Sequence, residues 1–420
     1  MQKGNSDSFH GYSERQIHAR SITFTSLGHL SNDLNLLLFS VLITYYYKDF
    51  GISLAVLGAV AILYNVFSGL LSTPVGRYAD RTRHYRWLIT LGLVIIGLSV
   101  VIFAFSFKLS GMVLPLMIVS AVVLGVGQAF YHPIGASILH LSYREKAASA
   151  LGINGSFGSI GRSVLPIVLV PLIALYGEFH ALLFLAAYMF IAALIIYSGL
   201  SYLKDQEVAH DDSNNVSENK NRKVQLGKYR GVLTILVMIV FIRAMFMTGT
   251  TTYISQYLVE KLHSEVIMSY VLTISFITAV VGQPVFGKIT EMNGGKFSII
   301  ITTIFSAVFF VFFMLSGSNA VLDTISYALF VFMAFTGFPV LLGYVGQIVP
   351  KEISTTSNGL VWGLGNTVGG GAGIGVMSLL LLRISLTDTM WIMLVFAVIS
   401  IVMLPLLPKR IKANKPAASP

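Results

Sequence analysis

Twelve long apolar stretches, separated by short polar loops, constrain this chain more than any other feature of its sequence. Each has about 20 residues or more, the length that a helix needs to cross the hydrocarbon core of a bilayer. Of the 420 residues, 55% are hydrophobic and only 11% are charged, a balance that excludes an ordinary soluble protein. The chain is therefore predicted to be an all-α polytopic membrane protein with twelve transmembrane helices. The stretches span approximately residues 22–47, 53–76, 87–107, 111–140, 147–176, 180–203, 231–258, 266–289, 297–316, 321–349, 353–382 and 386–407.

The positions of the basic residues predict the topology. The net charge is +10, and most Lys and Arg residues lie in the two tails and in the loops that follow even-numbered stretches. The other loops hold only Lys48, Lys108, Lys261 and Arg383. Because cytoplasmic loops are enriched in Lys and Arg, both termini are expected on the cytoplasmic side of the cell membrane. Topology thus accounts for the positive charge, and we expect no nucleic-acid partner.

A long polar loop at residues 204–230 divides the chain into two groups of six stretches, and it is predicted to be a flexible linker. The two groups share a short repeat, "GRYADRTRHYR" beginning at Gly76 and "GKITEMNGGK" beginning at Gly287. A duplicated six-helix unit is a common architecture of transporters, with the substrate site between the repeats. The expected parts are a tail at 1–20, a first half at 21–203, the linker at 204–230, a second half at 231–408 and a tail at 409–420.

The first copy of this repeat resembles a known family. Gly76, Asp80 and Arg81 have the spacing of the signature loop of the major facilitator superfamily, and the second copy has Gly287 and Glu291 at matching places. The resemblance implies that Gly76 lets two helices approach closely and that Asp80, with its basic neighbours, latches a cytoplasmic gate. The alternative is a basic loop that only sets topology.

Four further segments resemble the fosmidomycin-resistance branch of this superfamily. They are "GHLSND" in the first stretch, "FYHP" in the fourth, "GINGSFGS" in the fifth and "GYVGQIVPKE" before the eleventh. Members of that branch are exporters of small anionic phosphonates, so the resemblance implies export of a compound of this kind.

Five ionisable residues lie well inside the apolar stretches: His29, Asp33, His132, Arg162 and Arg243. Such residues are costly in hydrocarbon and are expected to face a partner or a water-filled cavity. His29 and Asp33 are four residues apart, so they share a helix face and together could bind a proton. We therefore expect them to couple transport to protons. The alternative is that Asp33 only forms a structural bridge to Arg162.

Other polar residues extend these positions into stripes along single helix faces. Gln128 lies four residues before His132, Asn154 lies eight residues before Arg162, and Tyr253 shares a face with Arg243. Asn358 and Trp362 form a similar stripe in the eleventh stretch. The predicted substrate-binding residues are Arg162, Arg243, His132, Gln128, Asn154, Tyr253, Asn358 and Trp362. The alternative for the histidines and asparagines is hydrogen bonding between packed helices.

The charges inside the stretches favour an anionic substrate, since two guanidiniums from different halves face one carboxylate. We therefore predict a monomeric, proton-coupled secondary transporter of a small anionic or amphiphilic compound, working outward by alternating access. The alternatives are a proton-coupled importer of an organic anion such as a carboxylate or sugar acid, a non-transporting membrane sensor and a channel. The chain has no cysteine and no phosphate-binding loop or HExxH motif, so we expect no enzyme activity, cofactor or metal.

Overall fold

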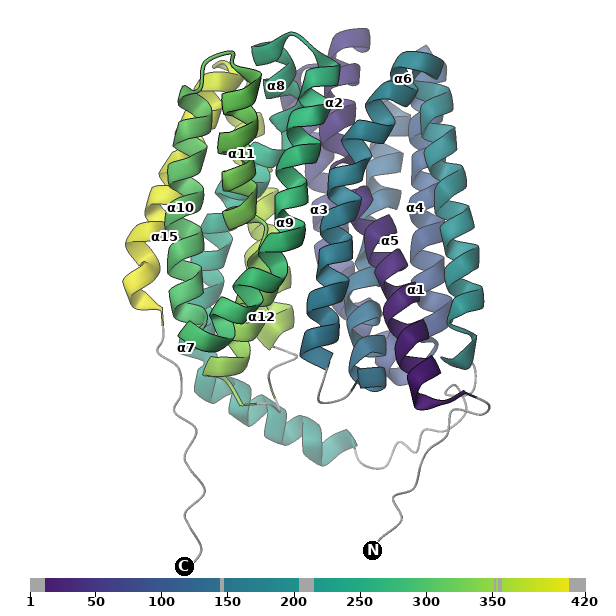
Figure 1. Cartoon of the computed structure of the whole chain (residues 1–420), viewed down its shortest axis with the longest axis vertical. Helices are drawn as coiled ribbons and strands as arrows, with labels where there is room; N and C mark the ends of the chain where they lie inside the picture. The colour runs from purple at the N-terminus through teal and green to yellow at the C-terminus, as the bar shows by residue number, and fades with distance from the viewer. Residues whose placement is uncertain (1–11, 144–146, 204–214, 351–352, 354–356, 408–420) are drawn as a thin grey trace, which may run out of the picture.

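The computed structural model describes residues 12–143, 147–203, 215–350, 353 and 357–407, and every regular element in these ranges is a helix. Ten helical segments of this described part are long and apolar enough to cross a membrane. They pack side by side into one bundle, in which α1 begins at the same end where α15 finishes (Figure 1).

The first half contains six spans. Its elements are α1 (Glu14–Leu34), α2 (Leu38–Phe50), α3 (Leu54–Thr82), α4 (Tyr85–Lys108), the short 3-10 helix η1 (Ser110–Met112), α5 (Val113–Tyr143) and α6 (Ala147–Gly199). Helices α1 and α2 together form the first span. Helix α6 contains the fifth and sixth spans, because Gly177 has φ 74 and ψ 165 and turns the chain back. The six predicted stretches of this half are therefore all helical.

The second half repeats this pattern. Its elements are α7 (Asn215–Thr252), α8 (Ile254–Leu262), α9 (Glu265–Asn293), α10 (Gly295–Leu315), α11 (Ala320–Ala334), α12 (Gly337–Ile348), the π-helix η5 (Leu360–Val368), α14 (Gly369–Leu380), α15 (Leu386–Met403) and the 3-10 helix η6 (Leu404–Leu406). Helices α11 and α12 together form one span. If α8 continues the span of α7, η5 and α14 form a further span and α6 counts as two, the ten segments become the twelve predicted spans. Helix α7 begins at Asn215, so the later part of the predicted linker is helical rather than flexible. Residues 204–214 and most of both predicted tails lie outside the described residues.

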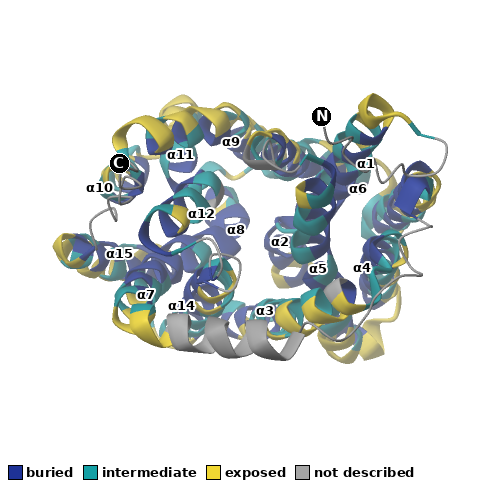
Figure 2. Ribbon diagram, turned by 90° about the horizontal axis from the view of Figure 1, so that it is seen from below, coloured by how far each residue is buried: buried dark blue, intermediate teal, exposed yellow. Residues whose placement is uncertain are grey.

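The outer surface of the bundle is apolar, as a lipid environment requires. Large hydrophobic side chains with more than two thirds of their surface exposed include Leu175, Leu194 and Val402. Figure 2 shows exposed residues on the outward faces of α7, α9 and α11, with buried residues turned inward. In water such a surface would drive aggregation, whereas lipid chains cover it without cost.

Several spans are interrupted, among them the span of α1 and α2 and the span of α11 and α12. Helix α1 ends in a tight turn in which the backbone amides of Asn35 and Leu36 donate to the carbonyls of Asn32 and Asp33, at 3.2 and 3.0 Å. Helix α11 ends at Ala334, and α12 begins only at Gly337. Each interruption leaves backbone amides and carbonyls without their helical partners. Within a membrane protein, such breaks are tolerated where protein or a polar cavity surrounds them.

The two halves meet through α6 with α9, α3 with α14, and α2 with α8. Helices α2 and α8 lie at the end of the bundle opposite the start of α1 (Figure 1). There the Ser40 and Ser255 hydroxyls are 3.0 Å apart, and Lys48 Nζ lies 2.6 Å from Glu265 Oε1. These contacts hold the halves together at this end.

Candidate functional site

A buried carboxylate, Asp33, lies at the centre of a polar cluster in the described interior. Its Oδ2 atom is 3.3 Å from His29 Nε2 and 3.8 Å from Arg162 Nη2. Its Oδ1 atom is 3.6 Å from His132 Nε2 and accepts a hydrogen bond from Asn32 Nδ2 at 3.0 Å. Helices α1, α5 and α6 therefore each contribute a charged or titratable group. The helix break directly after Asp33 places this cluster where α1 stops.

The hydrogen bonds of Asn154 determine which nitrogen of His29 faces Asp33. Tyr131 donates its hydroxyl proton to the carbonyl of Thr25 at 2.6 Å and accepts from Asn154 Nδ2 at 3.0 Å. The amide oxygen of Asn154 is thus left to accept from His29 Nδ1, at 2.8 Å. With Nδ1 protonated, Nε2 and the carboxylate attract each other only if one proton lies between them. The contact between His29 and Asp33 that their spacing predicted is therefore present, and it places a titratable ring nitrogen beside the carboxylate.

Gly158 of α6 leaves the space that this pair occupies. A Cβ atom at Gly158 would lie 2.5 Å from His29 Nε2 and 2.8 Å from Asp33 Oδ2. Those distances are far below van der Waals contact, and the nearby atoms belong to buried side chains. No residue larger than glycine therefore fits here without moving the pair.

His132 and Arg162 form the accessible side of the cluster. Their side chains are 28% and 13% exposed, whereas the Asp33 side chain is only 3% exposed. The His132 ring centroid is 6.4 Å from that of Trp362, and Arg162 Cζ is 5.8 Å from the Phe335 ring centroid. Both aromatic residues belong to the second half, so the cluster of the first half faces the second.

Arg243, the only ionisable residue predicted deep in the second half, lies at the break between α11 and α12. Its Nη2 atom donates to the carbonyl of Ala334 at 3.3 Å, and a Cβ atom at Gly337 would lie 3.7 Å from its Nη1. Its Nε atom is buried without a hydrogen-bond partner, and no carboxylate in the described part of the chain pairs with it. Arg162 reaches Phe335 of the same break from the other half. The two predicted guanidiniums thus both adjoin residues 334–337.

The remaining predicted binding residues divide into two groups. Gln128 and Asn358 each carry a buried polar atom, Nε2 and Oδ1 respectively, without a hydrogen-bond partner among the described residues. Trp362 lies within the π-helix η5 beside His132, and π-helical turns are frequent at functional sites. These three remain candidates for substrate contact.

Asn154 and Tyr253 are buried and make hydrogen bonds to other parts of the protein. Asn154 is buried behind His29 and orients it. Tyr253 is fully buried between the halves, where its hydroxyl lies 3.0 Å from Ser378 Oγ and donates to the carbonyl of Leu54 at 3.3 Å. Helical spacing predicted that Tyr253 lies on the same helix face as Arg243. However, α7 ends at Thr252 and α8 begins at Ile254, so Tyr253 lies at a break where the helix face of Arg243 does not continue.

The predicted gating residues lie where α3 and α9 end. A Cβ atom at Gly76 would be 3.2 Å from Pro133 of α5, and one at Gly287 would be 3.6 Å from Pro339 of α12. The close helix approach implied for Gly76 is present, and the second half repeats it more loosely. Arg81 and Glu291 are exposed, and the side chain of Asp80 lies outside the described residues. The latch itself stays a prediction.

One buried ion pair was missed by the sequence analysis. Lys261 Nζ of α8 lies 2.6 Å from Asp323 Oδ1 of α11 and donates to the carbonyl of Phe313 at 2.9 Å. Asp323 is fully buried. An acid in the first turn of the predicted 321–349 stretch was a visible signal, but its basic partner was assigned to a loop. The pair attaches α8 to α11.

Three side chains of the cluster could reach a metal ion, since ligand atoms of His29, Asp33 and His132 all lie within 4.8 Å of one another. However, the guanidinium of Arg162 lies 3.8 Å from the carboxylate that such an ion would need. A permanent cation at this position opposes a second one. The charge of Arg162 therefore disfavours a metal ion at this cluster.

Comparisons with known proteins agree with the twelve-span, two-half architecture. The family model described as Major Facilitator Superfamily matches residues 25–373 and 236–420. The fosmidomycin resistance protein of Escherichia coli (strain K12) is 24% identical over 350 residues, which are 82% of each chain. The uncharacterized MFS-type transporter YfnC of Bacillus subtilis (strain 168) is 22% identical over 343 residues, 80% of this chain and 81% of that protein.

Two solved structures have the same fold. The nucleoside transporter NupG superposes with a TM-score of 0.72 at 15% identity, over 92% of this chain and 98% of that one. A bacterial homologue of the human lysosomal transporter Spinster, in an inward-facing and unoccupied conformation, superposes with a TM-score of 0.71 at 13% identity. That match covers 96% of this chain and 97% of the other.

Proposed function

Because the chain belongs to the major facilitator superfamily, we propose that it is a proton-coupled secondary transporter of a small organic anion that works by alternating access. The observation that carries this proposal is the contact of one buried carboxylate, Asp33, with His29 and Arg162 at the place where α1 breaks. Breaks of this kind mark binding sites in transporters, which lie between the repeats.

The proton is assigned to the His29–Asp33 pair. When the pair loses its proton, the carboxylate neutralises Arg162 at 3.8 Å. When Asp33 is protonated, Arg162 keeps its full charge, because a guanidinium does not release its proton at physiological pH. One proton therefore switches the cluster by one unit of charge beside a fixed cation.

The anion is assigned to the space between Arg162 and Arg243, next to the break at residues 334–337. Planar guanidiniums bind carboxylates and phosphonates through paired hydrogen bonds. The first amides of α12 have no helical acceptors and carry the positive end of the helix dipole. These groups come from both halves, so an anion bound here would respond to their relative movement. The relative in Escherichia coli is named fosmidomycin resistance protein, so fosmidomycin, a phosphonate, is the first compound to test.

The direction of transport has two candidates. Export by exchange for protons is favoured by the sequence resemblance to the fosmidomycin-resistance branch. Import together with protons is favoured by the contact between Asp33 and Arg162, since protonation of Asp33 leaves Arg162 free for the anion. Each ligand then increases the affinity for the other, because coupling between two sites is reciprocal. Exchange needs the opposite relation, in which proton and substrate exclude each other.

The experiment that tests the proposal uses the purified protein in liposomes that enclose a pH-sensitive dye. Fosmidomycin, simple carboxylates and sugar acids are added outside, without an imposed gradient. Movement of anion and proton in the same direction acidifies the interior, and exchange makes it alkaline. Asp33→Asn is expected to abolish either signal, and Arg243→Ala to weaken it, whereas Glu260→Gln, at an exposed acid outside the predicted site and gate, serves as the matched control.

Two outcomes would reject parts of the proposal. A proton signal that persists in Asp33→Asn would remove the proton from this carboxylate. No signal and no exchange of labelled compound with any anion, from protein that is correctly folded, would leave the non-transporting sensor as the better interpretation.

A further inference from the structure

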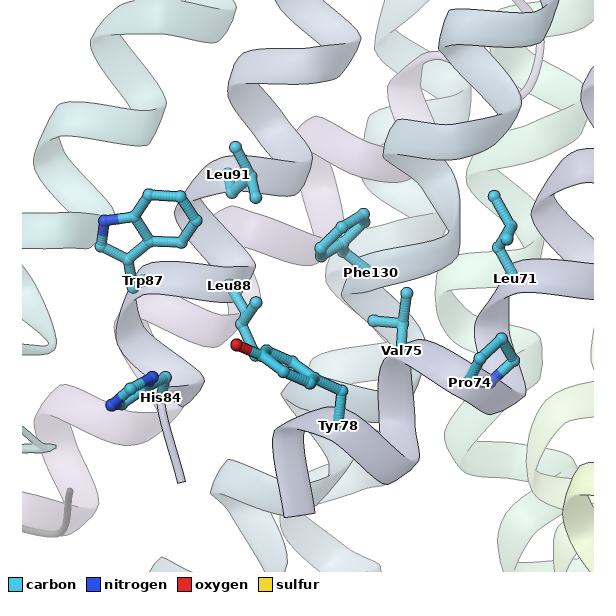
Figure 3. Close-up of a pocket in the computed structure, with 9 residues that line it drawn as sticks. All are labelled: Leu71, Pro74, Val75, Tyr78, His84, Trp87, Leu88, Leu91 and Phe130. Atoms are coloured by element: carbon cyan, nitrogen blue, oxygen red, sulfur yellow. The ribbon is translucent and has the colours of Figure 1, made fainter. Parts of the chain in front are cut away.

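A groove in the outer surface of the first half has no part in the transport site. Helices α3 and α4 both pack on α5, and between them lies a cavity of about 450 Å³ with Phe130 of α5 in its lining. Figure 3 shows the ring of Tyr78 reaching from α3 toward Leu88 of α4 across this space. The volume falls in the range of about 300–1,000 Å³ that is common for small-molecule sites.

The lining is apolar in its inner part and amphipathic near the end where α3 finishes. Leu71 and Pro74 of α3 and Leu91 of α4 line the inner part. Tyr78 and Trp87 line the other end and are 55% and 53% exposed. Tyrosine and tryptophan are enriched where a membrane protein passes from hydrocarbon to the polar headgroups. The groove therefore runs from the headgroup level into the hydrocarbon.

Positive charge collects at the polar end of the groove. Arg81 lies three residues after Tyr78 and so on the same face of α3, one turn closer to the helix end. It is exposed, and no hydrogen bond or ion pair to it is found within the described part of the chain. Arg77 is exposed as well. By contrast, Arg86 is occupied, since its Nε donates to the carbonyl of Tyr197 at 2.6 Å.

We propose that this groove binds an anionic glycerophospholipid of the leaflet on this side, with one acyl chain between α3 and α4 and its phosphate against Arg81. We infer this occupant from the charge at the mouth of the groove and from the depth of the groove in the membrane. An apolar channel that begins at headgroup level fits an acyl chain, and exposed guanidiniums at its mouth fit a phosphate. Positive residues on the cytoplasmic side and between helices are the usual features of such sites.

The second half provides an internal control for this assignment. The repeat places Lys288 where the first half has Arg77, but it has Met292 in place of Arg81 and Ser298 in place of Trp87. Lys288 is exposed and belongs to α9, away from the groove. General attraction of anionic lipid to a protein of net charge +10 would involve Lys288 as much as Arg81. A site in the groove would involve Arg81 alone.

The test is quenching of Trp87 by brominated lipid in vesicles of phosphatidylcholine. The other tryptophans, Trp362 and Trp391, are replaced by phenylalanine so that only Trp87 emits. Brominated phosphatidylglycerol is expected to reach half-quenching at a mole fraction about fivefold lower than brominated phosphatidylcholine, as one charged contact at the surface allows. Arg81→Gln should remove this difference, and Arg81→Lys should keep most of it.

The control and the refuting outcomes follow from the same measurement. Lys288→Gln, in the same background, should leave the preference of Trp87 unchanged. Equal quenching by the two lipids with Arg81 intact would overturn the proposal. So would an equal loss of preference in Arg81→Gln and Lys288→Gln, because the attraction would then come from the overall charge.

Discussion

Replacing Asp33 by asparagine should tighten anion binding while it removes proton coupling. In the wild-type protein, an ionised Asp33 lies 3.8 Å from Arg162 and neutralises it. An anion bound to the other side of that guanidinium, at about 2.8 Å, would lie roughly 7 Å from the carboxylate. Two like charges at that separation repel by about 2.4 kcal/mol for an effective dielectric constant of about 20. Removing one of them corresponds to a gain in affinity of roughly 50-fold.

Isothermal titration of the protein in lipid nanodiscs with the phosphonate of the liposome panel would measure this effect. Wild-type affinity should rise as the pH falls, because protonation of Asp33 removes the same repulsion. Asp33→Asn should bind tightly at every pH, and Glu260→Gln should behave as wild type. The reasoning is refuted if Asp33→Asn binds the anion more weakly, or if its affinity follows pH as the wild-type affinity does.

Two substitution pairs test the packing around the site and the buried ion pair. Gly158→Ala should abolish transport and lower the free energy of unfolding by about 1–3 kcal/mol, because its methyl group overlaps His29 and Asp33. Gly152→Ala should be tolerated, because a Cβ atom there has nothing within 4 Å. The two variants would be compared by thermal unfolding followed by intrinsic fluorescence and by the liposome assay. Asp323→Ala should cost about 3–5 kcal/mol, since it leaves the buried Lys261 unpaired. Lys48→Ala breaks a more exposed pair and should cost at most about 1 kcal/mol on the same measurement, so equal losses would contradict the difference in burial.

The arrangement of the spans was predictable from the sequence because hydrocarbon thickness sets their length. The predicted stretches correspond to single helices, to two helices in line or, for the fifth and sixth, to the two parts of α6. The interruptions were harder to foresee. The break at residues 35–37 contains neither proline nor glycine, and it depends on how the surrounding helices pack. Only the break before Gly337 has a nearby glycine and proline in its sequence.

Within the site, the spacing of residues predicted contacts between side chains on the same face of one helix. It did not predict contacts that form where a helix breaks. The i, i+4 spacing of His29 and Asp33 gave a real contact, and the expected neighbourhood of Arg162 is present. The acceptor for Arg243 could not be predicted, because the Ala334 carbonyl becomes available only where α11 ends. The contacts of Tyr253 with Leu54 and Ser378 could not be predicted for the same reason, since a helix face cannot be extrapolated beyond the end of its helix.

The uneven distribution of charge between the repeats bears on how such a protein changes over evolutionary time. Asp33, both histidines and Arg162 belong to the first repeat, whereas the second contributes Arg243 and the aromatic wall of Phe335 and Trp362. Under the roles proposed above, drift in the second repeat would alter which compounds are accepted and would leave proton coupling intact. Chimaeras that keep the first repeat and exchange the second would then be a direct route to new substrate ranges, and the reverse exchange would not.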